Sequence, residues 1–251
     1  MKYKSFVVAS VIFYFLGQGI GAYAQTPENI NPTLDKFSAE ITFYASYDET
    51  VDADLTNGSG KGTPRDAKNA IEYKPGKWGQ AFLSGLQSVS YPAAQNVDLS
   101  KPGSMAVWIN PFEWQRNAEQ IPGLYFVNVL DQGRQIMLSR MGDRRNREAV
   151  FAYGKVGNKG LSAKNGNSTN WQNGEWHLLV VNWRSAEFEF SLDGRPVRRQ
   201  EMPEFEKVVG KPGQIIVGAI GRKDQQFLVD ELMILNRPLA AEEIQWLWEQ
   251  K

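Results

Sequence analysis

The chain has 251 residues, with no cysteine, a single histidine, and 28 basic residues against 28 acidic ones. The lack of cysteine excludes disulfide bonds, thiolate metal sites and a cysteine nucleophile. The sole histidine, His177, gives little support for a zinc site or a Ser-His-Asp triad. Because there is no basic excess, we do not expect nucleic acid as a partner.

Residues 1–24 have the pattern of a secretion signal. Lys2 and Lys4 come first, residues 6–16 are apolar apart from Ser10, and Ala22-Tyr23-Ala24 is a small-x-small cleavage site. The apolar run is too short for a membrane span, which needs about 20 residues. We expect cleavage before Gln25, leaving 26 basic and 28 acidic residues. An exported chain without disulfides is typical of bacteria, so we expect a secreted or periplasmic protein with no membrane span after signal removal.

Residues 25–38 are polar with two prolines and predict a linker or N-terminal arm. In residues 39–251, short β-forming runs alternate with clusters of Gly, Asn, Pro and Asp, and only the end of the chain has a helical period. The predicted strands are residues 40–47, 80–82, 89–91, 104–110, 123–130, 134–140, 149–153, 176–183, 187–192, 214–217 and 227–235. Such a series without intervening helices predicts one all-β domain, an antiparallel sandwich.

The end of the chain predicts a short amphipathic helix. Ile244, Leu247 and Trp248 fall on one helical face, while Glu242 and Glu243 occupy the first turn, where the helix dipole favours acids. We expect this helix to dock on the sandwich.

Five stretches, in order, resemble laminin-G-like domains of the concanavalin A-like lectin and glucanase family. They are the GKWGQAFLSG hairpin at 76–85, the GSMAVWI strand at 103–109, the WHLLVVNW strand at 176–183, the LDGRPV turn at 192–197 and the closing VDELMILNRPLAAEEI at 229–244. The resemblance implies a concanavalin A-like jelly roll with a short C-terminal helix. One departure is Ala240, where the family has Ser or Thr, so a helix cap worth about 1 kcal/mol is missing.

The resemblance also implies a structural calcium ion. In such sandwiches the first and last strands lie together and often hold calcium with one acid from each, positions that Asp48 and Asp230 match. Calcium prefers carboxylate and main-chain oxygens. Asp52, and after it Asp54, are weaker candidates in the same acidic stretch. The alternative is that Asp48 and Asp52 are solvated loop acids and that Asp230 caps a turn.

Glycan-degrading enzymes share this fold, so pairs of acidic residues are candidate catalytic carboxylates. Glu187 and Glu189 point to one face of a strand roughly 6.6 Å apart, which glycoside hydrolysis permits. They lack the Glu-x-Asp pattern of laminarinase-like enzymes, and we expect a solvated strand face. A polysaccharide lyase would need a base such as His177, but this residue belongs to the Trp-His pair of the non-catalytic family, and we expect a structural role.

Aromatic residues in loops and at strand ends are candidates for stacking on sugar rings. Trp78, Trp108, Trp176 and Trp183 fall inside motif segments, and we expect them in the core. The basic run at 140–147 either binds an acidic polysaccharide through its arginines or forms a solvated turn. The predicted ligand-binding residues are Trp114, Trp171, Tyr125, Tyr153, Arg140 and Asn182.

Together these features predict an exported, non-catalytic carbohydrate-binding or adhesive module, with a polysaccharide or other glycan as partner. Two alternatives stay open. One is a glycan-degrading enzyme, a glycoside hydrolase or a polysaccharide lyase, on the same fold. The other is an envelope domain that binds another surface protein. Function at this point rests on fold-level analogy.

Overall fold

The computed structural model describes residues 31–114, 124–142, 148–156, 159–167, 170–185, 187–201, 213–220 and 223–250. The predicted signal segment at 1–24, the first part of the predicted arm and most of the basic run at 140–147 lie outside these ranges.

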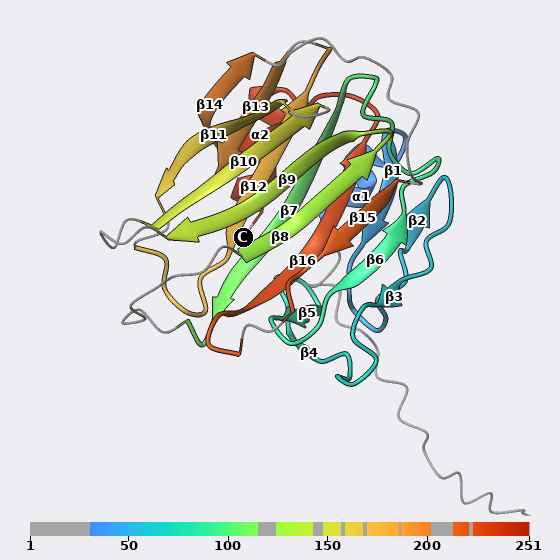
Figure 1. Ribbon diagram of the computed structural model, residues 1–251, viewed down its shortest axis with the longest axis vertical. Helices are drawn as coiled ribbons and strands as arrows, with labels where there is room; N and C mark the ends of the chain where they lie inside the picture. The colour runs from blue at the N-terminus through green and yellow to red at the C-terminus, as the bar shows by residue number, and fades with distance from the viewer. Residues whose placement is uncertain are drawn as a thin grey trace, which may run out of the picture.

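Two antiparallel sheets form the molecule, with the smaller sheet in front and the larger one behind it in Figure 1. The larger sheet has the order β14 (Arg195–Glu201), β13 (Glu187–Leu192), β12 (His177–Trp183), β7 (Gly103–Phe112), β16 (Gln226–Leu235), β1 (Ile41–Ala45) and β2 (Leu55–Thr56). Two further strands belong to the larger sheet outside this order: β5 (Gln80–Ser84) pairs with β16, and β4 (Tyr73–Pro75) pairs with β5. The smaller sheet has the order β11 (Lys159–Asn167), β10 (Glu148–Val156), β9 (Arg134–Gly142), β8 (Leu124–Asp131), β15 (Gln214–Val217), β6 (Val89–Pro92) and β3 (Thr63–Pro64).

The predicted sandwich is confirmed, and each predicted strand has a counterpart among these elements. The strands that the sequence did not predict are β2, β3, β4, β11 and β14. The first three are only two or three residues long and lie at sheet edges. Strand β14 is charged and almost fully exposed, so it has no apolar alternation. Its pairing with β13 makes it a strand.

The core lies between the sheets and is lined by every second residue of the strands. The central strands β7, β12 and β16 are buried on both faces. Their inner face packs against the smaller sheet, while their outer face packs against α1 (Pro32–Phe37) and α2 (Ala241–Glu249). Trp108, for example, belongs to the outer cluster and its neighbour Val107 to the inner core.

Helix α1 corrects part of the expected loose arm. Asn31 caps this helix by accepting a hydrogen bond from the Thr33 amide at 2.8 Å, and Phe37 is completely buried. The Asn31 side chain also donates to Tyr44 of β1 and to Glu231 of β16. Residues 31–37 are therefore packed on the sandwich, because a cap and a buried ring fix them there.

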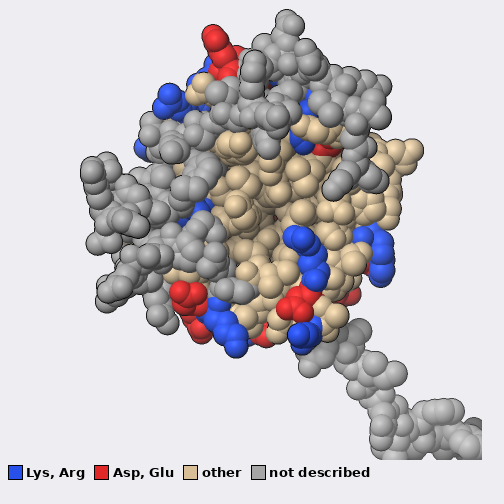
Figure 2. Space-filling model, in the orientation of Figure 1, with Lys and Arg blue, Asp and Glu red and all other residues tan. Residues whose placement is uncertain are grey.

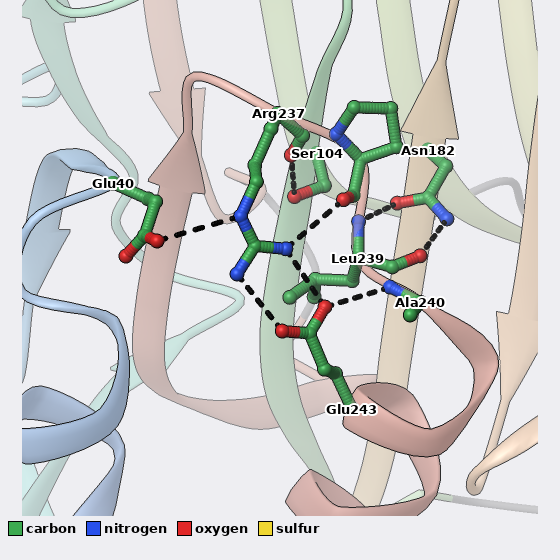
Figure 3. Close-up of polar contacts among 8 residues, drawn as sticks. Glu40, Ser104, Asn182, Arg237, Leu239, Ala240 and Glu243 are labelled. Carbon is green, nitrogen blue, oxygen red and sulfur yellow. Dashed lines mark hydrogen bonds and ion pairs between the residues drawn. The ribbon is translucent and has the colours of Figure 1, made fainter.

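Helix α2 is attached to the larger sheet by the network in Figure 3. Arg237 binds the Glu243 carboxylate with both terminal nitrogens, at 2.7 and 2.8 Å. The amide of Asn182 donates to the Leu239 carbonyl at 2.8 Å and accepts from its N–H at 2.9 Å. Ala240 supplies no side-chain cap, as predicted, but Glu243 accepts the Ala240 N–H at 2.8 Å. A neighbouring acid therefore replaces part of the missing cap.

Candidate glycan surface and cation site

The outer face of the smaller sheet presents a rung of side chains that crosses its central strands. Tyr153 of β10 is paired with Met137 of β9, Met137 with Asn128 of β8, Asn128 with Ile216 of β15, and Ile216 with Ser90 of β6. All five side chains are half-buried. They point outward because their neighbours along each strand belong to the buried core.

Tyr125 lies beside this rung on β8 and is 52% exposed, a high value for a large aromatic side chain. Asn128, on the same strand, accepts a hydrogen bond from Gln135 at 2.7 Å, so its amide is held in position. Figure 2 shows that the middle of this face is uncharged among the described residues, with charged side chains around its edges. The arrangement offers rings for stacking and oriented amides for hydrogen bonds.

Trp114 and Trp171 do not lie on this surface, and the expectation that they are exposed is corrected. They are only 7% and 5% exposed, and their rings stack on each other with centroids 6.0 Å apart. Trp171 stacks on His177 with centroids 3.8 Å apart. On the other side, the Arg140 guanidinium lies 3.8 Å from the centre of the Trp114 ring. Arg140, Trp114, Trp171 and His177 therefore form one continuous stack inside the protein.

Arg140 and Asn182 are also inside the protein, each 2% exposed. Arg140 hydrogen-bonds to the buried side chain of Gln225, and Asn182 holds Leu239 beneath α2. The predicted position of both at a ligand surface is corrected. Arg140 lies on the inner face of β9 with Ile136 and Leu138, and alternation along the strand did not indicate which face lies inward. Asn182 lies on the outer face of β12, where Leu239 and α2 cover it.

His177 has the structural role that the sequence predicted. Its Nδ1 lies 2.9 Å from a carboxylate oxygen of Asp193, and its ring is 9% exposed in the stack with Trp171.

Glu187 and Glu189 form the predicted outward strand face, since Phe188 and Phe190 between and beside them are buried. Arg199 of β14 lies 3.7 and 3.6 Å from the two carboxylates.

Asp48 and Asp230 converge on one loop, as the predicted cation site requires. The Asp230 carboxylate accepts the Lys77 N–H at 2.6 Å, and the Asp48 carboxylate accepts the Gln80 N–H at 2.8 Å. Gly76 is the reason that the loop comes so close, because a Cβ there would lie 2.6 Å from an Asp230 oxygen. A Cβ at Gly79, whose φ is +56°, would overlap Asp48.

Asp230 is completely buried, and its Oδ1 has no hydrogen-bond partner within the described structure. Burial raises the pKa of this carboxyl well above its ordinary value, and the neighbouring Glu231 and Asp48 raise it further. Burial also raises the pKa of Glu231, to about 8, and that of Asp48. A bound cation or a proton would offset this concentration of negative charge.

Glu231 is the member of this site that the sequence analysis missed. A β-bulge in β16 follows Asp230, and Glu231 has a φ of +55°, which is uncommon for a residue other than glycine. Its carboxylate accepts hydrogen bonds from Tyr44 and Asn31. Two adjacent acids in an otherwise apolar final strand were the available signal.

Asp52 lies apart from this cluster. Its carboxylate accepts hydrogen bonds from Lys61 and from the Gly62 N–H, both at 2.9 Å, and Lys61 lowers its pKa. These contacts agree with the alternative reading of Asp52 as a loop acid rather than a cation ligand. Asp54 accepts the Ser46 N–H at 2.7 Å at the end of β1.

The acids fit a cation in part. The orphaned oxygen of Asp230 and the neighbouring Asp48 suit a hard ion that binds oxygen. Across the part of the chain that is described, however, no group of three or more His, Cys, Asp or Glu side chains could hold a metal. Any such ion would therefore need main-chain carbonyl oxygens as further ligands.

Two packed antiparallel sheets with a short closing helix define a jelly-roll sandwich of the concanavalin A type. The chain belongs to the concanavalin A-like lectin/glucanases superfamily, whose family model matches residues 83–245. The predicted family is therefore confirmed. A search of curated proteins gives no match.

Solved structures with the same fold include receptor-binding domains of botulinum neurotoxins. The serotype D binding domain has a TM-score of 0.66 at 12% identity and covers 84% of this chain. A type C neurotoxin structure, whose cell entry is described as dependent on two ganglioside molecules, has a TM-score of 0.67 at 10% identity and covers 86%. The DC binding domain in complex with rat synaptotagmin II has a TM-score of 0.65 at 10% identity and covers 84%. This chain spans about half the length of each, 51–52%.

Within the described ranges, no helix has the length and apolar character needed to cross a membrane.

Proposed function

We propose that this protein is an exported, non-catalytic carbohydrate-binding module that holds a glycan on the outer face of its smaller sheet. The observation that carries this proposal is Tyr125, a half-exposed aromatic ring on a sheet face whose middle is uncharged among the described residues. Tyr153 of β10 supplies a second ring at the level of Asn128 of β8, and the Asn128 amide is held by a hydrogen bond from Gln135 at 2.7 Å. Sugars have apolar C–H faces for stacking and hydroxyls for hydrogen bonds.

The neurotoxin neighbours support a binding role, since cell entry of one depends on ganglioside molecules and the binding domain of another forms a complex with rat synaptotagmin II. At 10–12% identity these relatives share the fold alone, so the ligand of this chain is inferred from its own surface. Export is inferred from the signal pattern at residues 1–24.

A calcium ion is part of this proposal. Asp48 and Asp230 would bind it, and Glu231 would contribute negative charge beside them. Such an ion would supply positive charge that links the first and last strands. Its role would be structural, because the acids lie behind the larger sheet and away from the outer face of the smaller one.

A glycan array followed by titration of the best ligand tests the proposed surface. We expect Tyr125→Ala to weaken binding roughly 5- to 150-fold, since loss of a stacked ring costs about 1 to 3 kcal/mol. Leu55→Ala is the control, because Leu55 is a 39% exposed apolar residue of the other sheet. Unchanged affinity in Tyr125→Ala would contradict the proposed surface.

Release of reducing ends should be measured with the same glycan. Turnover by the wild-type protein that disappears in Glu187→Gln would show a glycan-degrading enzyme instead. An array without any glycan ligand would favour the alternative of a protein-binding envelope domain.

A further inference from the structure

A pocket of about 380 Å³ opens on the outer face of the larger sheet, on the opposite side of the molecule from Tyr125. Its size lies at the lower end of the range of small-molecule sites, about 300–1,000 Å³. The residues that line it are Lys77, Trp108, Glu175, Trp176, His177 and Trp248.

Three indoles from separate parts of the chain meet at this pocket. Trp108 comes from β7, Trp176 directly precedes β12, and Trp248 comes from α2. The rings of Trp108 and Trp248 stack with centroids 5.6 Å apart and an interplanar angle of 21°. Trp108 is buried, whereas Trp176 and Trp248 are half-buried and present part of their surface to the pocket. The expected core position is confirmed for Trp108, which is 3% exposed, while Trp176 packs against the same cluster and is only half-buried. Both also line this pocket.

The two charged side chains of the pocket are fixed by their surroundings. The Lys77 ammonium lies 4.8 Å from the ring centre of Trp108 and 5.0 Å from that of Trp78. The main chain at Lys77 is held by its hydrogen bond to Asp230. A Glu175 carboxylate oxygen accepts the Gln172 N–H at 2.9 Å. One cation and one anion therefore border the indoles.

We propose that this pocket binds a single pyranose ring of a neutral glycan. Indole surfaces suit the C–H faces of a sugar, while the ammonium donates to hydroxyl groups and the carboxylate accepts from them. Because Lys77 and Glu175 carry opposite charges, the pocket has no net attraction for an anion or a cation, and an uncharged ligand suits it. The volume lies at the lower end of the range of ligand sites, which suits a single sugar ring. This site is independent of the surface proposed above, and it would make the module bivalent for glycans.

Indole N–H signals in an NMR titration test the proposal on the full mature chain. The probes are the methyl glycosides of glucose, galactose, mannose and N-acetylglucosamine at millimolar concentrations. We expect at least one probe to shift the signals of Trp176 and Trp248. Trp248→Ala should weaken that probe's binding about tenfold or more, as expected for loss of a stacked ring.

Trp246→Ala is the matched control, because Trp246 lies on the same helix but packs against Phe37, with ring centroids 5.9 Å apart. If Trp246→Ala and Trp248→Ala lose binding equally, the cause is detachment of α2 from the sheet, and the proposal is overturned. Glu175→Gln provides a second test, since this exposed residue can change without repacking the indoles, and we expect it to weaken binding by several-fold.

Tyr125→Ala should leave pocket binding unchanged, so failure of this proposal is distinguishable from failure of the proposed function. If none of the probes shifts the Trp176 or Trp248 signal, the pocket is not a pyranose site.

Discussion

Trp171 is the centre of the buried stack that runs from Arg140 to His177. Its ring contacts Trp114 on one side and His177 on the other, and Phe126 packs near it with centroids 6.5 Å apart. Since the ring is 95% buried from solvent, its contribution is to stability. A loop residue between two strands thus takes part in closing one end of the core.

We expect Trp171→Ala to lower the free energy of unfolding by about 3 to 5 kcal/mol, because it removes a large buried ring and leaves a cavity. Trp171→Phe should cost less, since part of the ring remains. Chemical denaturation measures both values. A loss below about 1 kcal/mol in the alanine variant would mean that the ring is exposed in solution and available as a ligand platform.

At the scale of an element, α2 is held by an ion pair in addition to its apolar face. Ile244 and Leu247 are buried against the larger sheet. Arg237 holds Glu243 of the first turn from outside the helix, and it also lies 3.5 Å from Glu40. The hydrogen bonds from Arg237 lower the pKa of Glu243 below its ordinary value.

The pH dependence of stability tests this ion pair. A carboxyl with a lowered folded pKa stabilises the protein above its unfolded pKa of about 4.3, and the contribution is lost as the pH falls through the folded pKa. We expect Glu243→Gln to cost about 1 kcal/mol at neutral pH, because the partner Arg237 is partly exposed. The difference from wild type should vanish at the acid end of the titration.

Glu242→Gln is the matched control, with the same substitution in the same helical turn. Glu242 is exposed and has no such arginine contact among the described residues. Equal losses in the two variants would attribute the effect to the helix dipole and contradict a specific role for Arg237.

At the scale of the whole molecule, the antiparallel pairing of β1 with β16 joins the two ends of the domain. The register pairs Ala45 with Leu232, which brings Asp48, just beyond β1, to the level of Asp230. The hairpin loop at 76–80 is fixed between them. Three segments far apart in the sequence therefore meet at one group of acids.

We expect added calcium to raise the melting temperature and a chelator to lower it, since a ligand bound only by the native state stabilises it by mass action. At 100 times the dissociation constant the gain is about 2.7 kcal/mol. Asp230→Asn should abolish the response. Asp52→Asn should preserve it, because Asp52 is paired with Lys61. An identical melting temperature with calcium and with chelator would rule out the ion.

The sequence by itself determined the class of this protein. Period-2 alternation as in Phe188, Phe190 and the glutamates beside them, with turns such as Asp193-Gly194, is local chemistry that dictates strands and hairpins. The order of the motifs then indicated the family, which the family model confirms. The juxtaposition of Asp48 and Asp230 followed from that resemblance.

Only the tertiary structure decided which face of each strand lies inward. Alternation separates Trp108 from Val107 but does not say which sheet or helix covers each one. Arg140, Trp114 and Trp171 lie inside because stacked rings and a buried amide replace water around the guanidinium. Trp248 reaches Trp108 because α2 folds back onto the larger sheet. Contacts between residues so distant in the chain depend on packing, which the local sequence pattern does not contain.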